Sequence, residues 1–279
     1  MSDNWVVANI ESAFNTWNDK MTEIWSLVTT SPQSFKGGGI WSIITSINGG
    51  LQAIGYALLI LFFAMSIFKS TASFRDFQRP EYALKHFIRF LAAKVAITYA
   101  LDIMTTIYTI CGGVVDSIAG SLGGIGGAAV TLPSTVETAI EDAGFWASIP
   151  LWLVTILGSL FITVMSFIMI MSVYGRFFKL YMYTALAPIP LSSFAGEGTS
   201  QVGKSFIKSY IGVCLEGAVV ILACLIFSAY ASASAPAPDS GLTTVTMVWK
   251  YLGEVIFNML VLVGLIKGAD NIIRSMLGL

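Results

Sequence analysis

The segment with the most recognisable chemistry is Gly198-Thr199-Ser200-Gln201-Val202-Gly203-Lys204-Ser205, which fits the phosphate-loop pattern G-x-x-x-x-G-K-[ST]. In that motif, backbone N–H groups cradle phosphates, the lysine reaches the β- and γ-phosphates and the final hydroxyl binds Mg²⁺. The chemistry needs a buried strand before the loop and a helix after it, within an α/β unit. Whether this chain is a nucleotide-using enzyme therefore depends on the elements around the loop.

The remaining reactive side chains show no enzymatic arrangement. His86 is the only histidine and lies between Lys85 and Arg89, which favours a place at the inner membrane interface over a role as ligand or base. Cys111, Cys214 and Cys224 lie in or beside apolar runs without metal-ligand spacing, so we interpret them as reduced and structural. We expect no catalytic residue, no cofactor and no metal site.

The elements that must carry these residues are membrane helices. Residues 37–68 and 143–175 contain no Asp, Glu, Lys or Arg, and about 20 apolar residues suffice for a helix to cross the hydrocarbon core. The whole chain is 56% apolar and 11% charged, whereas soluble domains carry about 25% charged residues. The composition is typical of an integral membrane protein.

Cations gather in alternate gaps between the apolar runs, which predicts orientation. The gap 112–142 carries only acidic charges, whereas the stretches on either side of it are basic. Cytoplasmic loops are enriched in Lys and Arg, so we expect 112–142 outside the cell and the basic stretches inside. The candidate inner-face basic positions are Arg75, Arg79, Lys85, Arg89, Arg176, Lys179, Lys204 and Lys208.

These patterns predict an all-α integral membrane protein with five transmembrane helices, an outer N-terminus and a cytoplasmic C-terminus. The expected spans are residues 43–68, 87–110, 146–174, 210–230 and 247–266. Residues 177–195 are apolar but are interrupted by Pro188 and Pro190, and both flanks carry inner-face cations. We therefore expect this segment to be re-entrant or interfacial. The predicted parts are an external amphipathic segment 1–36, a membrane bundle 37–230, and a fifth span with a cytoplasmic tail in 231–279.

Two external segments allow more than one interpretation. The apolar residues of 5–28 recur every three or four positions, which predicts an amphipathic helix that lies at the membrane interface or packs on its own protein. They are Val7, Ile10, Phe14, Trp17, Met21, Ile24 and Val28. The glycine-rich loop 112–142 is either a mobile loop or a subunit or pore contact, and its Ser134-x-x-Glu137 capping box predicts a short helix ending near Gly144.

Ionisable residues inside the expected spans are candidates for function, because charge at that depth is costly. Lys94, Thr98 and Asp102 share one face of the second span, and Glu216 lies on the fourth. Lys94 and Glu216 have opposite charges at similar depth, so one hypothesis pairs them. The alternative is that Lys94 reaches the interface and Glu216 pairs elsewhere. On the fifth span, Lys250 and Glu254 are one turn apart and are expected to pair.

The same elements argue against a nucleotide site. The helix after Gly198–Ser205 becomes a membrane span, and no later stretch offers a parallel strand. We interpret Lys204 as an inner-face charge and predict that the chain is not an enzyme.

Two stretches resemble a known family: SPQSFKGGGIW, which begins at Ser31, and RFFKLYMYTALAPIPLSSFAGEGTSQVGKSFIKSYIGVCLEGAVVILAC, which begins at Arg176. They are similar to the TrbL-type polytopic inner-membrane subunit of conjugative type IV secretion systems, in the form carried by Gram-positive mobile elements. The resemblance implies a multi-pass protein of the bacterial cytoplasmic membrane, with a channel or scaffold role in moving relaxase-bound single-stranded DNA. It implies partner subunits, including the ATPases that supply energy, and self-association into a homo-oligomer, with membrane lipid around it.

Two other functions remain as alternatives. The polar face of the second span and the proline-broken segment would suit an autonomous small-solute transporter or permease. Against it, the sequence shows no inverted repeat, and five spans do not divide into equal halves. A membrane enzyme that uses Gly198–Ser205 is the least favoured interpretation.

Overall fold

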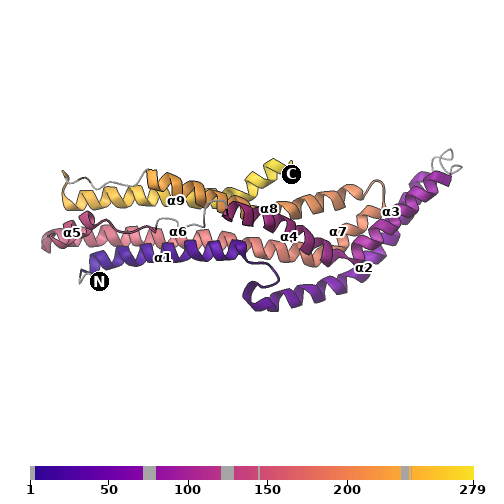
Figure 1. Cartoon of the computed structure of the whole chain (residues 1–279), viewed down its shortest axis with the longest axis horizontal. Helices are drawn as coiled ribbons and strands as arrows, with labels where there is room; N and C mark the ends of the chain where they lie inside the picture. The colour runs from indigo at the N-terminus through magenta and orange to yellow at the C-terminus, as the bar shows by residue number, and fades with distance from the viewer. Residues whose placement is uncertain (1–3, 72–79, 121–128, 144, 234–238, 240) are drawn as a thin grey trace. The chain divides into compact units, whose positions relative to one another are not determined.

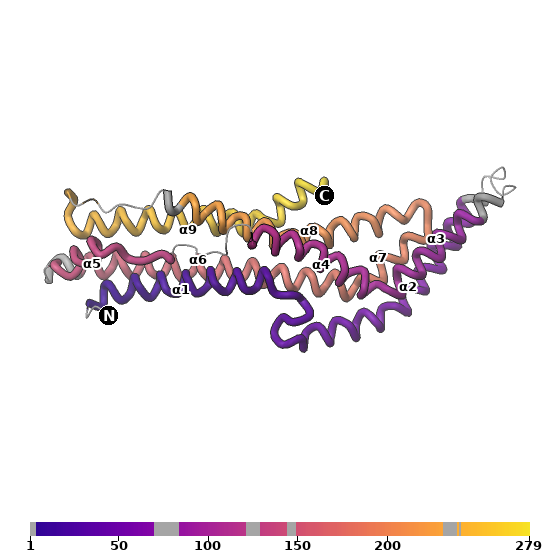
Figure 2. The backbone as a smooth tube through the Cα atoms, viewed as in Figure 1, coloured from indigo at the N-terminus to yellow at the C-terminus, as the bar shows by residue number. Residues whose placement is uncertain are grey.

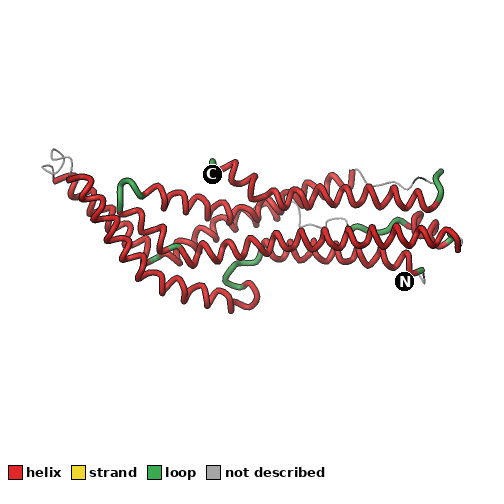
Figure 3. The backbone as a smooth tube through the Cα atoms, turned by 180° about the vertical axis from the view of Figure 1, so that it is seen from behind, coloured by secondary structure: helices red, strands yellow, loops and turns green. Residues whose placement is uncertain are grey.

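The computed structural model describes residues 4–71, 80–120, 129–143, 145–233, 239 and 241–279, and every regular element among them is helical (Figure 3). The elements are α1 Trp5–Thr29, η1 Phe35–Gly38, α2 Gly39–Thr71, α3 Pro80–Thr98, α4 Ala100–Gly120, α5 Ser134–Glu141, α6 Phe145–Leu186, α7 Pro188–Ser192, η2 Ser193–Ala195, α8 Ser200–Ala233 and α9 Thr244–Leu277 (Figure 1). The predicted all-α class is confirmed.

Within the described residues, five helical segments are long and apolar enough to cross a membrane. They are Phe35–Lys69, Ala100–Gly120, Ile149–Leu186, Ser200–Tyr230 and Thr244–Leu277. The predicted number of spans is therefore confirmed, whereas the orientation of the chain remains a prediction.

The helix expected over residues 87–110 is divided in the structure, and the candidate span in this part of the chain is Ala100–Gly120. The predicted residues 87–110 are divided between α3, which ends at Thr98, and α4, which begins at Ala100. The Thr98 hydroxyl donates to the Lys94 carbonyl at 2.9 Å, and the Thr98 carbonyl accepts a 3.4 Å bond from Gln52 Nε2. Threonine hydroxyls that bond to a preceding carbonyl bend helices, which explains a boundary that hydropathy does not reveal.

The helix expected over residues 146–174 is also longer, because α6 continues without interruption through Arg176 to Leu186. The helix stops where Pro188 would have to donate an N–H to the Thr184 carbonyl, which proline cannot do. That carbonyl instead accepts a 2.7 Å hydrogen bond from Asn48 Nδ2, and Asn48 is fully buried. Residues 177–195 thus comprise the end of α6 followed by α7 and η2, and their re-entrant or interfacial placement stays a prediction.

The chain forms two compact units. The first comprises Met1–Thr29, Asp116–Tyr174 and Gly217–Ala269. Here α1 runs beside α6 (Figure 2), with Ser159 Oγ donating to the Asn9 carbonyl at 3.0 Å and Tyr174 Oη donating to Glu23 at 2.8 Å. The apolar stripe of α1 is buried, and Trp17 is 1% exposed. Of the two interpretations of this helix, the structure supports packing on its own protein.

The second unit comprises Thr30–Val115, Gly175–Glu216 and Asp270–Leu279. Its core includes Leu59, Ile97, Met104, Leu191 and Tyr210. A Cβ added at Gly55 would lie 2.9 Å from the Pro188 carbonyl oxygen, so only glycine allows α7 to approach α2 this closely.

The short helix in the glycine-rich loop was predicted correctly, but the predicted Ser134–Glu137 capping box does not form. α5 covers Ser134–Glu141 with Pro133 in the capping position, and no side chain caps it. The part of the glycine-rich loop at 121–128 lies outside the described residues.

Candidate functional site

Four ionisable residues from three membrane helices meet within the second unit. Lys179 of α6 lies between two carboxylates, with its Nζ 3.5 Å from Glu216 Oε2 of α8 and 3.5 Å from Asp270 Oδ1 of α9. Arg274 continues the chain of charges, with its Nε 3.1 Å from Asp270 Oδ2. Arg176 of α6 interacts electrostatically with Glu216. We call Arg176, Lys179, Glu216 and Asp270 the intramembrane charge cluster.

Arg176 is the most deeply buried member of the intramembrane charge cluster, at 2% exposed. Its Nε donates to the Val213 carbonyl at 3.3 Å and its Nη2 to the Cys214 carbonyl at 3.2 Å, while Nη1 is buried without a hydrogen-bond partner. A guanidinium presents several donors in one plane, so Arg176 binds two successive carbonyls of α8. It is a buried link between α6 and α8, and its predicted place at the inner face of the membrane stays a prediction.

The hypothesis that Lys94 pairs with Glu216 is wrong within this chain. Glu216 is 7% exposed and pairs with Lys179, whereas the Lys94 side chain is exposed and makes no ion pair among the described residues. Asp102 is also exposed, and the Thr98 hydroxyl contacts Tyr56 Oη at 2.9 Å. The polar face of the second span therefore does not converge on Glu216.

A second group of charges in the same unit joins α3 to the turn before α8. Lys85 Nζ and Arg89 Nη2 lie 3.1 and 2.9 Å from the same oxygen, Oε1 of Glu197. We call these three residues the Glu197 clamp. Hydrogen bonds from Arg89 and Lys85 lower the pKa of Glu197 to about 2. Lys85 and Arg89, two of the predicted inner-face cations, thus bind the turn that contains Glu197. The role of Glu197 was not predicted.

The other predicted basic positions form no comparable group. Lys204 and Lys208 are exposed on α8, and Arg75 and Arg79 lie outside the described residues. The phosphate-loop pattern lacks its structural context: Ser200 begins α8, η2 and a turn precede it, and the described residues contain no strand. Nor do those residues contain a cluster of His, Cys, Asp or Glu that could hold a metal ion.

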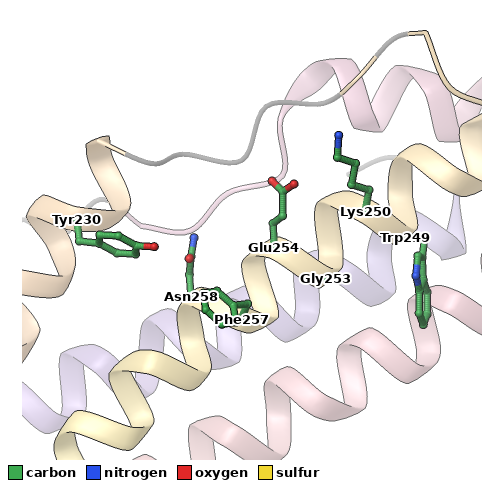
Figure 4. Close-up of a pocket in the computed structure, with 7 residues that line it drawn as sticks. All are labelled: Tyr230, Trp249, Lys250, Gly253, Glu254, Phe257 and Asn258. Carbon is green, nitrogen blue, oxygen red and sulfur yellow. The ribbon is translucent and has the colours of Figure 1, made fainter.

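A pocket of about 540 Å³ opens on α9 within the first unit and is lined by Tyr230, Trp249, Lys250, Gly253, Glu254, Phe257 and Asn258 (Figure 4). Lys250 was expected to pair with Glu254. Instead its Nζ lies 3.6 Å from Asp239 Oδ2. Its walls are aromatic and polar side chains of α9 together with Tyr230 of α8, and they show no catalytic arrangement.

Sequence reasoning missed Asp270 and the pairing role of Lys179. The signal for Asp270 was present, since it follows the charge-free part of the fifth span by a few residues. Its partner could not be found, because Lys179 and Asp270 are far apart in the sequence and only the packing of α6 against α9 brings them to 3.5 Å.

The comparisons with known proteins agree with this architecture. The family model described as TrbL/VirB6 plasmid conjugal transfer like protein matches residues 17–188, more than half of the chain. No curated protein and no solved structure matches. The match covers Arg176 and Lys179, and the family is a structural component of conjugal transfer rather than an enzyme family. With its five apolar helices, the chain is a multi-pass protein of the cytoplasmic membrane, and it belongs to the TrbL/VirB6 family of conjugal transfer proteins.

Proposed function

We propose that this protein is a channel or scaffold subunit of a conjugative type IV secretion system that helps relaxase-bound single-stranded DNA across the donor membrane. The observation that carries the proposal is how little of its apolar surface the chain buries by itself. Only 17% of the apolar window of Phe35–Lys69 and 22% of that of Ala100–Gly120 are buried. Helices with so much free apolar surface suit contact with lipid and with neighbouring subunits, as in a larger assembly.

A second observation argues against a self-contained transporter. In such transporters, broken helices surround a substrate site near the membrane midplane. Here the charges at depth are paired with one another, because Lys179 bridges Glu216 and Asp270. Partner ATPases would supply the energy for transfer, and copies of this chain would assemble with each other and with the other secretion subunits.

The test uses a donor strain that lacks the gene and is complemented with a tagged copy. We expect conjugation to fall to background without the protein, and formaldehyde cross-linking during mating to recover the transferred strand with the tagged subunit. Lys204→Ala serves as a control that keeps near-normal transfer. Normal conjugation without the protein, or loss of uptake of a small solute instead, would overturn the proposal.

A second measurement concerns assembly. In mild detergent, the tagged protein from mating-competent cells should migrate far above the mass of one 30.0 kDa chain plus its micelle. A monomer in several detergents, in the presence of its partner subunits, would contradict the proposed assembly.

A further inference from the structure

The exposed side of α1 is polar along most of its length. One face of the helix packs in the first unit. On the opposite face, exposed residues recur at alternating steps of three and four positions. From the second turn onward these are Ser12, Asn15, Asp19, Thr22, Ser26 and Thr29. We call them the α1 polar face. It contains no cation, and the nearby Lys20 is paired with Glu23 at 2.6 Å.

The contacts of α1 place the helix beside the apolar part of α6, with the α1 polar face left exposed. Asn9 bonds to Ser159 and Glu23 bonds to Tyr174, so the two helices run in the same direction. At 1.5 Å per residue, α1 advances about 21 Å between its two contacts and α6 about 22.5 Å. The helices therefore stay in register, and each residue of α1 has a counterpart on α6 at the same level.

At those levels, α6 presents only apolar groups to its surroundings. Its exposed residues include Phe161, Val164, Phe167 and Met171, which are 46–69% exposed, and residues 143–175 contain no charge. Such a surface belongs in contact with hydrocarbon. The α1 polar face, which spans about 26 Å at the helical rise, then covers most of the roughly 30 Å depth of the bilayer core.

A face with Asn15 and Asp19 does not suit lipid contact at that depth, since polar and ionisable groups inside a membrane face a bundle interior or a water-filled cavity. From this we propose that the α1 polar face lines a water-filled path through the assembly, and that the transferred strand passes along it. This inference rests on the proposed function. It also revises two expectations. Residues 1–36 would not be simply external, and because α1 runs parallel to α6 it would add a crossing in the same direction, so the orientation predicted for α2 from five crossings no longer follows.

The chemistry of the face suits passage rather than retention. Hydroxyl and amide groups offer hydrogen bonds to water and to phosphate oxygens. Without Lys or Arg, the face lacks the positive charges through which proteins bind a nucleic acid backbone tightly and in a salt-dependent way. A polyanion can therefore slide along the wall without binding to it.

Cysteine accessibility tests the placement in intact donor membranes. All three native cysteines are buried, so the parent chain serves as the control for background labelling. Asn15→Cys is matched with Val164→Cys, and Thr22→Cys with Met171→Cys, at neighbouring levels on α6. We expect a charged, water-soluble thiol reagent to label both α1 variants at least tenfold faster than their α6 partners. Equal labelling of both helices would place the segment outside the bilayer and overturn the proposal.

Two further outcomes would also overturn it. If the α1 cysteines resist the reagent but cross-link between copies under oxidation, the face is a contact between subunits. If they neither react nor cross-link, the face meets lipid or another component. These labelling results need no conjugation, so they are independent of the gene-deletion test of the proposed function.

A last measurement tests whether the transferred DNA strand passes along the α1 polar face. Attaching a bulky charged reagent at Asn15→Cys in mating donors should lower conjugation at least tenfold, and the same treatment of Val164→Cys should leave it unchanged. Complete labelling of Asn15→Cys with normal transfer would show that the path does not carry the strand.

Discussion

Two ion-pair groups within the same compact unit use the same chemistry in different surroundings. In the intramembrane charge cluster, Lys179 lies 3.5 Å from Glu216, whose side chain is 9% exposed. In the Glu197 clamp, the distances are shorter, 3.1 and 2.9 Å, but the Glu197 side chain is 56% exposed. The longer contacts should nevertheless contribute more to stability. Removing one member of a buried pair leaves the other charge buried without a partner, whereas exposed pairs contribute about 0–1 kcal/mol.

The largest effect is expected for removing the cation of the buried pair. Lys179→Met leaves Glu216 without its nearest cation and should lower stability by about 3–5 kcal/mol, seen as reduced membrane abundance and a lower midpoint of thermal unfolding in detergent. The double variant Lys179→Met/Glu216→Gln should recover part of that loss, because neither side chain then carries a buried charge.

The matched control is Lys208→Met, which removes an exposed lysine from α8. It should stay within about 0.5 kcal/mol of the parent. If the control and Lys179→Met cost the same, burial does not distinguish the two groups of charges.

A smaller loss is expected at Arg176. Arg176→Lys keeps the positive charge and one donor for an α8 carbonyl but loses the planar fork that reaches two, and the loss of one hydrogen bond from a charged group costs about 1.5–3 kcal/mol. The thermal midpoint should fall less than for Lys179→Met. A variant as stable as the parent would show that charge alone, without the two bonds to Val213 and Cys214, links α6 to α8.

The Glu197 clamp should respond weakly to mutation and predictably to pH. Glu197→Gln should cost below about 1 kcal/mol at neutral pH. Because the pKa is lowered from 4.5 to about 2, the clamp contributes fully above the ordinary pKa and is lost as pH falls through about 2. The thermal midpoints of parent and Glu197→Gln should thus differ by a constant amount from pH 8 to 5 and converge at lower pH. A difference that grows on acidification would contradict the sign of this shift.

The smallest effect belongs to Lys94. Because this side chain is exposed and pairs with no described residue, Lys94→Met should change membrane abundance by no more than the Lys208→Met control. Combined with Glu216→Gln, its effect should simply add. A coupling above about 0.5 kcal/mol in this double-mutant cycle would show that Lys94 and Glu216 meet after all, between copies of the chain.

Hydropathy and charge were enough to predict the helical class, the number of spans and the apolar stripe of α1, because these depend on composition and local period. That the stripe packs on the protein itself, and where two of the helices end, could not be predicted. The Thr98 carbonyl is bonded by Gln52, and α6 continues past Arg176 because that arginine finds acceptors on α8. In the same way, the depth of Glu216 was visible in the sequence, but its partner depends on helix packing.

The bond between Asn48 and Thr184 has a consequence for biosynthesis. The two residues are 136 positions apart, and chains grow at about 5–20 residues per second. The Thr184 carbonyl that accepts the bond from the Asn48 amide is therefore synthesised about 7–27 s after Asn48. During that interval α2 carries an unsatisfied polar group in an apolar setting. The timing of synthesis thus becomes part of how this protein reaches its fold.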